Sequence, residues 1–187
     1  MKGWTLNFSL LVLFAAAVAI AQGPGRGFGP GMGMGGGGLM MGGGPNSGQG
    51  GDYAQVFHAL LSAHQSIKRT VQPTNKGISS LTESNNPRVA RLIQLHVEQM
   101  RQLLEGCGNG QCPSQPRFWD PLFAAVYRNA HKIDMEVEPA TKGVKVAETG
   151  NDPQSVQLVQ MHAAVVSSFV KNGMAEMHQS HAAPPGA

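Results

Sequence analysis

Apolar residues recur at helical spacing in four segments of the chain. They return every three or four positions, which is the period of a helix buried along one side. Three of the segments open with a proline directly after a residue suited to capping a helix, namely Asn86, Asp120 and Asp152. The predicted helices span about 53–71, 87–106, 121–137 and 153–178.

The second half of this pattern repeats the first at one constant offset along the sequence. Two helical hairpins of this length predict an all-α domain, a four-helix bundle built from the repeats at about 53–106 and 119–178. A pseudo-twofold axis is expected to relate the repeats. The matched pairs include Phe57 with Phe123, Pro87 with Pro153, Gln94 with Gln160 and His96 with His162.

A turn and a short extended piece separate the two helices of each repeat. These pieces, residues 76–84 and 142–150, are each compatible with one strand. The two symmetry-related strands would pair as a small antiparallel β ribbon, which is marginal unless something packs beneath it.

The segment 1–21 has the features of a secretory signal peptide. Lys2 precedes an apolar run, Leu10–Ile20, and Ala19-Ile20-Ala21 is a small-x-small cleavage site. An uncleaved anchor is the alternative, but the run is short for a membrane span of roughly 20 residues. We therefore expect a periplasmic or secreted protein with no membrane span after cleavage.

Residues 22–52 differ in composition from the rest of the chain, since they are dominated by glycine. Such a segment buries too little apolar surface to fold, so a flexible tether is predicted. Its methionines, such as Met32 and Met40, also allow a loose Cu(I) site, because Cu(I) takes thioether ligands. The folded domain is expected over 53–181, followed by a disordered tail at 182–187.

Charge and motifs argue against two classes of function. The formal net charge is +3 and no basic cluster stands out, so no nucleic-acid partner is expected. The chain has no nucleophile elbow, no HExxH and no phosphate-binding glycine loop ahead of a helix, so an enzyme is not expected.

Cys107 and Cys112 lie close together in a loop-like stretch. A disulfide is expected in an oxidising compartment, with metal ligation or a free redox pair as alternatives. No Cys-x-x-Cys-His motif is available for covalent haem attachment.

Four histidines fall at similar distances from the prolines that mark the helix ends. In an antiparallel bundle, equal distances mean equal heights, so one core layer is predicted from His64, His96, His131 and His162. Imidazole is a common ligand of copper, zinc and iron. Ordinary core histidines with hydrogen-bond partners are the alternative. Only His96 and His162 are in strict register.

A second candidate cluster lies near the C-terminus. Residues four apart on a helix share a face, which pairs Met174 with His178 and Met177 with His181. Mixed thioether and imidazole ligands favour copper. A frayed end whose methionines complete the core is the alternative.

Several strings resemble those of a family of exported bacterial proteins with a duplicated helical domain, sometimes found beside cytochrome c modules. They are Thr82-Glu83-Ser84-x-x-Pro87, Asp120-Pro121-Leu122-Phe123 and the segment Asn172–His181. The resemblance spans about Phe57 to the C-terminus. It implies a periplasmic setting and redox partners such as cytochromes, and it supplies no catalytic residues.

Three functions are expected from these features. The first is copper binding for storage, delivery or detoxification, with the four histidines as the core site and the Met/His cluster as the site of metal uptake. The second is electron transfer with a non-covalent b-type haem held by His96 and His162. The third is an interaction or scaffold domain whose histidines are ordinary core residues. For any of the three, a homodimer that exchanges hairpins is an alternative to a bundle formed within one chain.

Overall fold

The computed structural model describes residues 48–112 and 115–187. The predicted signal peptide, and the predicted tether up to residue 47, lie outside the described residues. Each repeat folds in the order helix, strand, strand, helix. The elements of the first repeat are α1 (Gly48–Ser62), η1 (His64–Ser66), β1 (Ile67–Thr74), β2 (Gly77–Ser84) and α2 (Pro87–Gly108). Those of the second are α3 (Pro121–Arg128), η2 (Ala130–Lys132), β3 (Ile133–Ala140), β4 (Gly143–Gly150), α4 (Pro153–Asn172) and η3 (Gly173–Glu176).

The prediction of an all-α four-helix bundle is wrong, because residues 48–112 and 115–187 combine four α-helices with a four-stranded sheet. The error lies in the first helix of each repeat. Ile67 and Val71 are separated by a spacing that fits one face of a helix and also one face of a strand. In the structure this segment is a strand. α1 ends at Ser62, and Ile67, Arg69 and Val71 are partly buried while the residues between them are exposed.

The sheet is antiparallel with the order β1-β2-β4-β3. Its central pair, β2 with β4, joins the two segments expected to form a ribbon, and β1 and β3 extend that pair on either side. Ser80 lies opposite Val146, which is its own equivalent in the second repeat. The pseudo-twofold axis therefore passes between these two residues.

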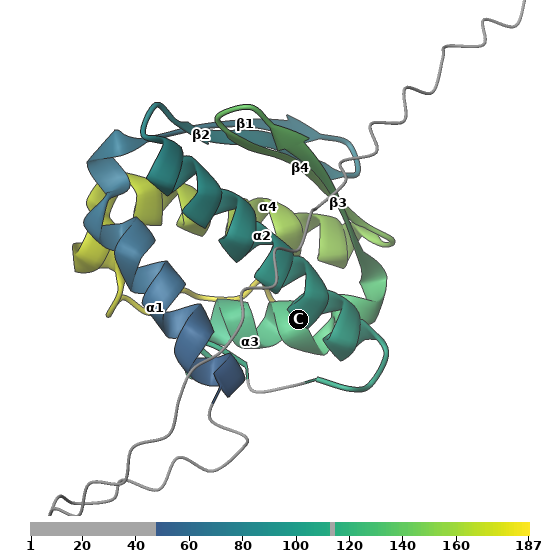
Figure 1. The fold of residues 1–187 in the computed structure, drawn as a ribbon. Coiled ribbons are helices and arrows are strands. Elements are labelled where there is room, and N and C mark those ends of the chain that lie inside the picture. The colour runs from purple at the N-terminus through teal and green to yellow at the C-terminus, as the bar shows by residue number, and fades with distance from the viewer. Residues whose placement is uncertain (1–47, 113–114) are drawn as a thin grey trace, which may run out of the picture. The chain divides into compact units, whose positions relative to one another are not determined.

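Helices cover one face of the sheet (Figure 1). α2 and α4 contact the strands, and α1 and α3 pack against α2 and α4 respectively. All three helices that open with proline have the predicted N-cap, for example Asn86, whose side chain accepts from the backbone N–H groups of Arg88 and Val89. No helix in the described part of the chain is long and apolar enough to cross a membrane.

A glutamine from each repeat holds the hairpin turn of the other repeat. The Gln94 side-chain amide donates to the carbonyl oxygens of Ala140 at 3.0 Å and Gly143 at 2.9 Å. Gln160 makes the equivalent bonds to the β1–β2 turn at 3.1 and 3.3 Å. The repeated glutamine thus ties the two halves together around the axis.

The C-terminal residues run back along α3 and are not a disordered tail as predicted. The Leu122 N–H donates to the His181 carbonyl at 3.1 Å, Pro184 is buried, and Ala183 packs against the core. The predicted fourth helix is also shorter than expected, because it ends at Asn172. Gly173 has φ of +57°, and a side chain there would collide with the ring of His64.

The predicted pairing of Cys107 with Cys112 is confirmed, since the two sulfurs are at bonding distance. The bond closes the short loop after α2.

Candidate functional site

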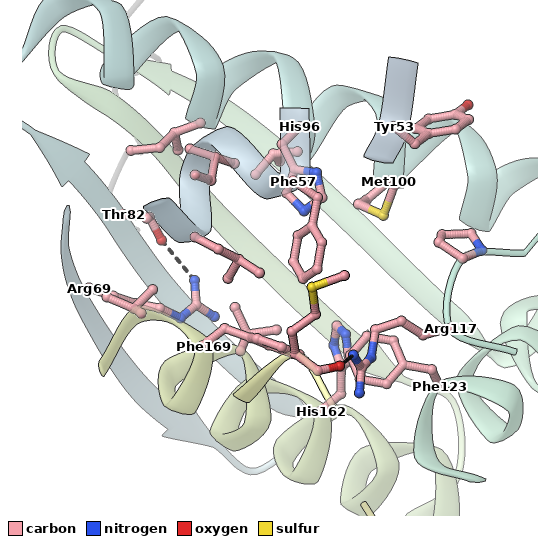
Figure 2. A pocket seen from close by; sticks show the side chains of 18 of the residues that line it. Tyr53, Phe57, Arg69, Thr82, His96, Met100, Arg117, Phe123, His162 and Phe169 are labelled. Atoms are coloured by element: carbon pink, nitrogen blue, oxygen red, sulfur yellow. Dashed lines mark hydrogen bonds between the residues drawn. The ribbon is translucent and has the colours of Figure 1, made fainter. Parts of the chain in front are cut away.

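A cavity of about 620 Å³ lies between the sheet and the helices. Every α-helix and every strand contributes at least one lining residue, so both repeats build it. Most of the lining is apolar, and a few polar side chains converge on it (Figure 2). This size and lining are typical of small-molecule sites, which measure roughly 300–1,000 Å³.

Two equivalent pairs of rings face each other across the cavity. Phe57 stacks on His96 with ring centroids 5.8 Å apart and planes at 28°. Phe123 meets His162 edge to face at 5.2 Å and 81°. Phe169 lies between the pairs, 5.3 Å from Phe57 and 6.3 Å from Phe123. The repeat therefore places a phenylalanine and a histidine on each side of one space.

His96 reaches the cavity from the middle of α2. Burial, and then the nearby charge of His162, lower the pKa of His96 to about 4, so its imidazole is neutral at pH 7. Its Nδ1 is buried and has no hydrogen-bond partner within the described residues. A buried polar atom without a partner is uncommon and costs free energy. His96 is therefore a neutral imidazole in the cavity wall, with one nitrogen left without a partner among the described residues.

His162 reaches the same cavity from α4. Its Nδ1 lies 3.9 Å from the Glu148 carboxylate, which is too long for a hydrogen bond. The Glu148 side chain is 13% exposed and also lines the cavity. It is the equivalent of Thr82 in the first repeat, so the two halves of the site differ in charge.

Arg117 lines one side of the cavity. Its guanidinium lies over the rings of Trp119, Phe123 and Phe169 at 4.6, 5.1 and 5.0 Å. It donates to the Asp120 carboxylate at 2.9 Å and to the Met177 carbonyl. Stacking on rings and pairing with a carboxylate together hold this cation in place.

Asp120 connects Arg117 to the C-terminal segment. Its fully buried carboxylate accepts from the Leu122 N–H at 3.1 Å and contacts His181 Nδ1 at 2.7 Å, and His181 Nε2 contacts Glu176 at 3.0 Å. Burial alone would raise the pKa of Asp120, but the hydrogen bonds from His181 and Arg117 hold it below its usual value. An ionised network therefore fastens the chain end beside the cavity.

The predicted four-histidine layer is not formed. His64 borders the cavity, but its Nδ1 is hydrogen-bonded to the Val170 carbonyl at 3.0 Å, and His131 lies exposed in η2. Among residues 48–112 and 115–187, no three His, Cys, Asp or Glu side chains are placed to hold a metal ion. The prediction placed the histidines at one height by assuming that helices continue through residues 71 and 137. The chain forms strands at both places, so the predicted heights do not apply.

The members of the predicted C-terminal Met/His cluster do not come together in one site either. Met177 and His178 border the cavity, Met174 is 44% exposed, and His181 is bound to two carboxylates. The break at Gly173 removes the helical spacing that would have aligned these side chains. Of the predicted ligands, the structure brings His96 and His162 to the two equivalent places in the cavity.

Sequence reasoning missed the residues that complete the site. Phe57 and Phe123 were matched in the repeat, but their packing against the paired histidines was not inferred. Arg69 and Arg117 lie outside any motif. A search for repeat partners that differ in charge, such as Arg69 against Met135, would have found the first of them.

Comparisons of the chain with known protein families, curated proteins and solved structures find no match. The resemblance to exported bacterial proteins stays a prediction.

Proposed function

We propose that this domain is a binding module for a small, largely apolar, ring-containing molecule, which occupies the cavity and is contacted by His96. The observation that carries the proposal is a space of about 620 Å³ built by both repeats around a neutral histidine whose Nδ1 lacks a partner within the described residues.

The size of the space supports a ligand. It falls in the range typical of small-molecule sites, and its lining is mostly apolar. Several of the lining side chains are aromatic. Phe57 and Phe123 each pack against Phe169 and against one histidine, and their rings form part of the cavity wall. Such walls suit a flat or ring-containing molecule.

The proposal is tested by titrating the protein with 9-anthracenemethanol, an uncharged fluorescent probe. We expect saturable binding at one site per chain. Val166→Trp places a large side chain in the cavity lining and is expected to abolish binding. Ala164→Trp adds the same side chain on the exposed side of α4 and is expected to bind as the wild type does. Equal binding by both variants, or no binding by the wild type, would contradict the proposal.

A second candidate ligand is b-type haem, favoured by the equivalent positions of His96 and His162. Haem iron takes two imidazoles as axial ligands in many electron-transfer sites, and such ligands must be unprotonated. The imidazole of His96 is neutral at pH 7, which supports this role. Bound haem would supply one-electron redox chemistry, while the protein would hold the group and exclude water from it.

The haem candidate is tested by adding haemin to the purified protein and recording its absorption spectrum. A shifted, low-spin spectrum at one haem per chain is expected. His96→Ala and His162→Ala should each lose that spectrum, whereas His131→Ala, which removes an exposed histidine, should keep it. A spectrum that survives in both cavity variants would exclude this pair as the ligands.

We further propose a periplasmic or secreted location, with redox proteins such as cytochromes as partners if the ligand is haem. The signal-like segment before residue 22 and the paired cysteines support an exported location.

A further inference from the structure

Arg69 is the cation of the cavity that has no close anionic partner among the described residues. It extends from β1 toward the cavity and donates to the Thr82 hydroxyl at 2.8 Å (Figure 2). Its Nε is buried and has no hydrogen-bond partner in the described chain. Guanidinium carries five N–H donors in a planar fork, and the bond to Thr82 satisfies only one of them.

No carboxylate among the described residues forms an ion pair with Arg69. The Glu148 carboxylate is too far from Arg69 to form an ion pair, although its charge raises the pKa of Arg69. Burial lowers that pKa by more than Glu148 raises it. The Glu148 carboxylate lies instead beside His162, at 3.9 Å. The other cation of the lining, Arg117, already pairs with Asp120. Arg69 is therefore a desolvated cation facing a cavity.

The repeat shows that the fold does not need this charge. The equivalent position in the second half is Met135, on the same face of the sheet and also in the cavity lining. A methionine would fill the place without the cost of burying an unpaired charge. An anionic group on a bound molecule would pair with Arg69 and offset the cost of burying its charge.

We propose that Arg69 binds a carboxylate of the ligand, so that the ligand is an apolar, ring-containing acid with its acidic group directed at the sheet. This inference rests on the proposed function and adds the charge and orientation of the ligand. Two sources share the chemistry: a simple hydrophobic carboxylic acid, and haem, whose side chains include carboxylates.

The test compares 9-anthracenecarboxylate with 9-anthracenemethanol, which share the ring system and differ in the acidic group. Arg69→Met copies the second repeat and should weaken binding of the carboxylate roughly tenfold to hundredfold, the range expected for a hydrogen bond to a charged group. Binding of the alcohol should not change. Lys68→Met removes a cation from the exposed side of the same strand and should leave both affinities as they are.

The outcomes separate the two proposals. If the alcohol binds but Arg69→Met leaves the carboxylate affinity unchanged, the role of Arg69 is overturned and the proposed function stands. If neither probe binds, both fall. A haemin titration distinguishes the sources: a loss of haemin affinity in Arg69→Met assigns the carboxylate to haem, and a loss confined to the anthracene acid assigns it to a simple acid. Circular dichroism checks that the variant is folded, and Arg69→Lys should restore part of the carboxylate affinity.

Discussion

At the scale of single residues, His96 is the side chain on which the site depends most. α2 carries it into an apolar interior, where Phe57 packs on one face of the ring and a protonated imidazole is disfavoured. Its repeat partner His162 stands beside a carboxylate and differs from it in environment. The strict register of these two histidines was visible in the sequence, but the arginines and aromatic rings around them were not, because their grouping depends on the sheet.

The depressed pKa of His96 predicts how the ligand-free protein responds to acid. The unfolded His96 takes up a proton near pH 6.5 and the folded one only near 4, so the free energy of unfolding falls as the pH drops from about 6.5 to 4. The slope from this one group is at most about 1.4 kcal/mol per pH unit, and it vanishes above pH 6.5. Urea unfolding of wild type and His96→Phe at pH 7, 6 and 5 measures it.

The variant should be less sensitive to acid than the wild type over this range. His131→Ala, on the protein surface, controls for the removal of a histidine as such. Identical pH slopes for wild type and His96→Phe would show that His96 is not held neutral by the fold.

At the scale of elements, the repeat was a better guide than the period of the apolar residues. Its constant offset correctly paired the two central strands and two of the three proline-led helix starts, Pro87 and Pro153. The apolar period misled at Ile67 and Val71, and again at Ile133 and Val137, because a spacing of four satisfies both a helix and a strand. What decides between them is strand pairing. β1 pairs with β2 and β3 with β4, each across a short hairpin turn, so each of these strands is stabilised by its hairpin partner rather than by its own sequence alone.

The glutamines that tie the repeats together make a prediction at this scale. Gln160→Ala removes two hydrogen bonds to the β1–β2 turn and should lower the free energy of unfolding by about 1 to 2 kcal/mol. Chemical denaturation measures the change. Gln157→Ala, on the exposed side of the same helix, should have little effect. A larger loss for Gln157→Ala would contradict the role given to the repeated glutamine.

At the scale of the whole molecule, the chain end completes the domain. The segment after η3 passes over α3 and is fixed by His181, which joins the buried Asp120 to Glu176. Met177 in this segment borders the cavity, and its carbonyl binds Arg117. The stability of the domain and the wall of the cavity thus share one network.

His181→Ala should loosen this network. Asp120 would keep Arg117 but lose its hydrogen bond to His181 in a buried site, at a cost of about 1 to 3 kcal/mol. Thermal unfolding at pH 7 should show a lower midpoint, and bound 9-anthracenemethanol should dissociate faster in stopped-flow fluorescence. His178→Ala, an exposed histidine of the same segment, is the matched control for stability. An unchanged midpoint in His181→Ala would argue against a structural network at this end.

The central claim is that the cavity between the sheet and the helices receives a ligand, and magnetic resonance can locate that ligand directly. The measurement is the set of intermolecular proton contacts (NOEs) between bound 9-anthracenecarboxylate and the labelled protein. The account predicts contacts from the probe to the rings of Phe57 and Phe123, and therefore to both repeats at once. Contacts confined to the outer surface, or to one repeat alone, would contradict it.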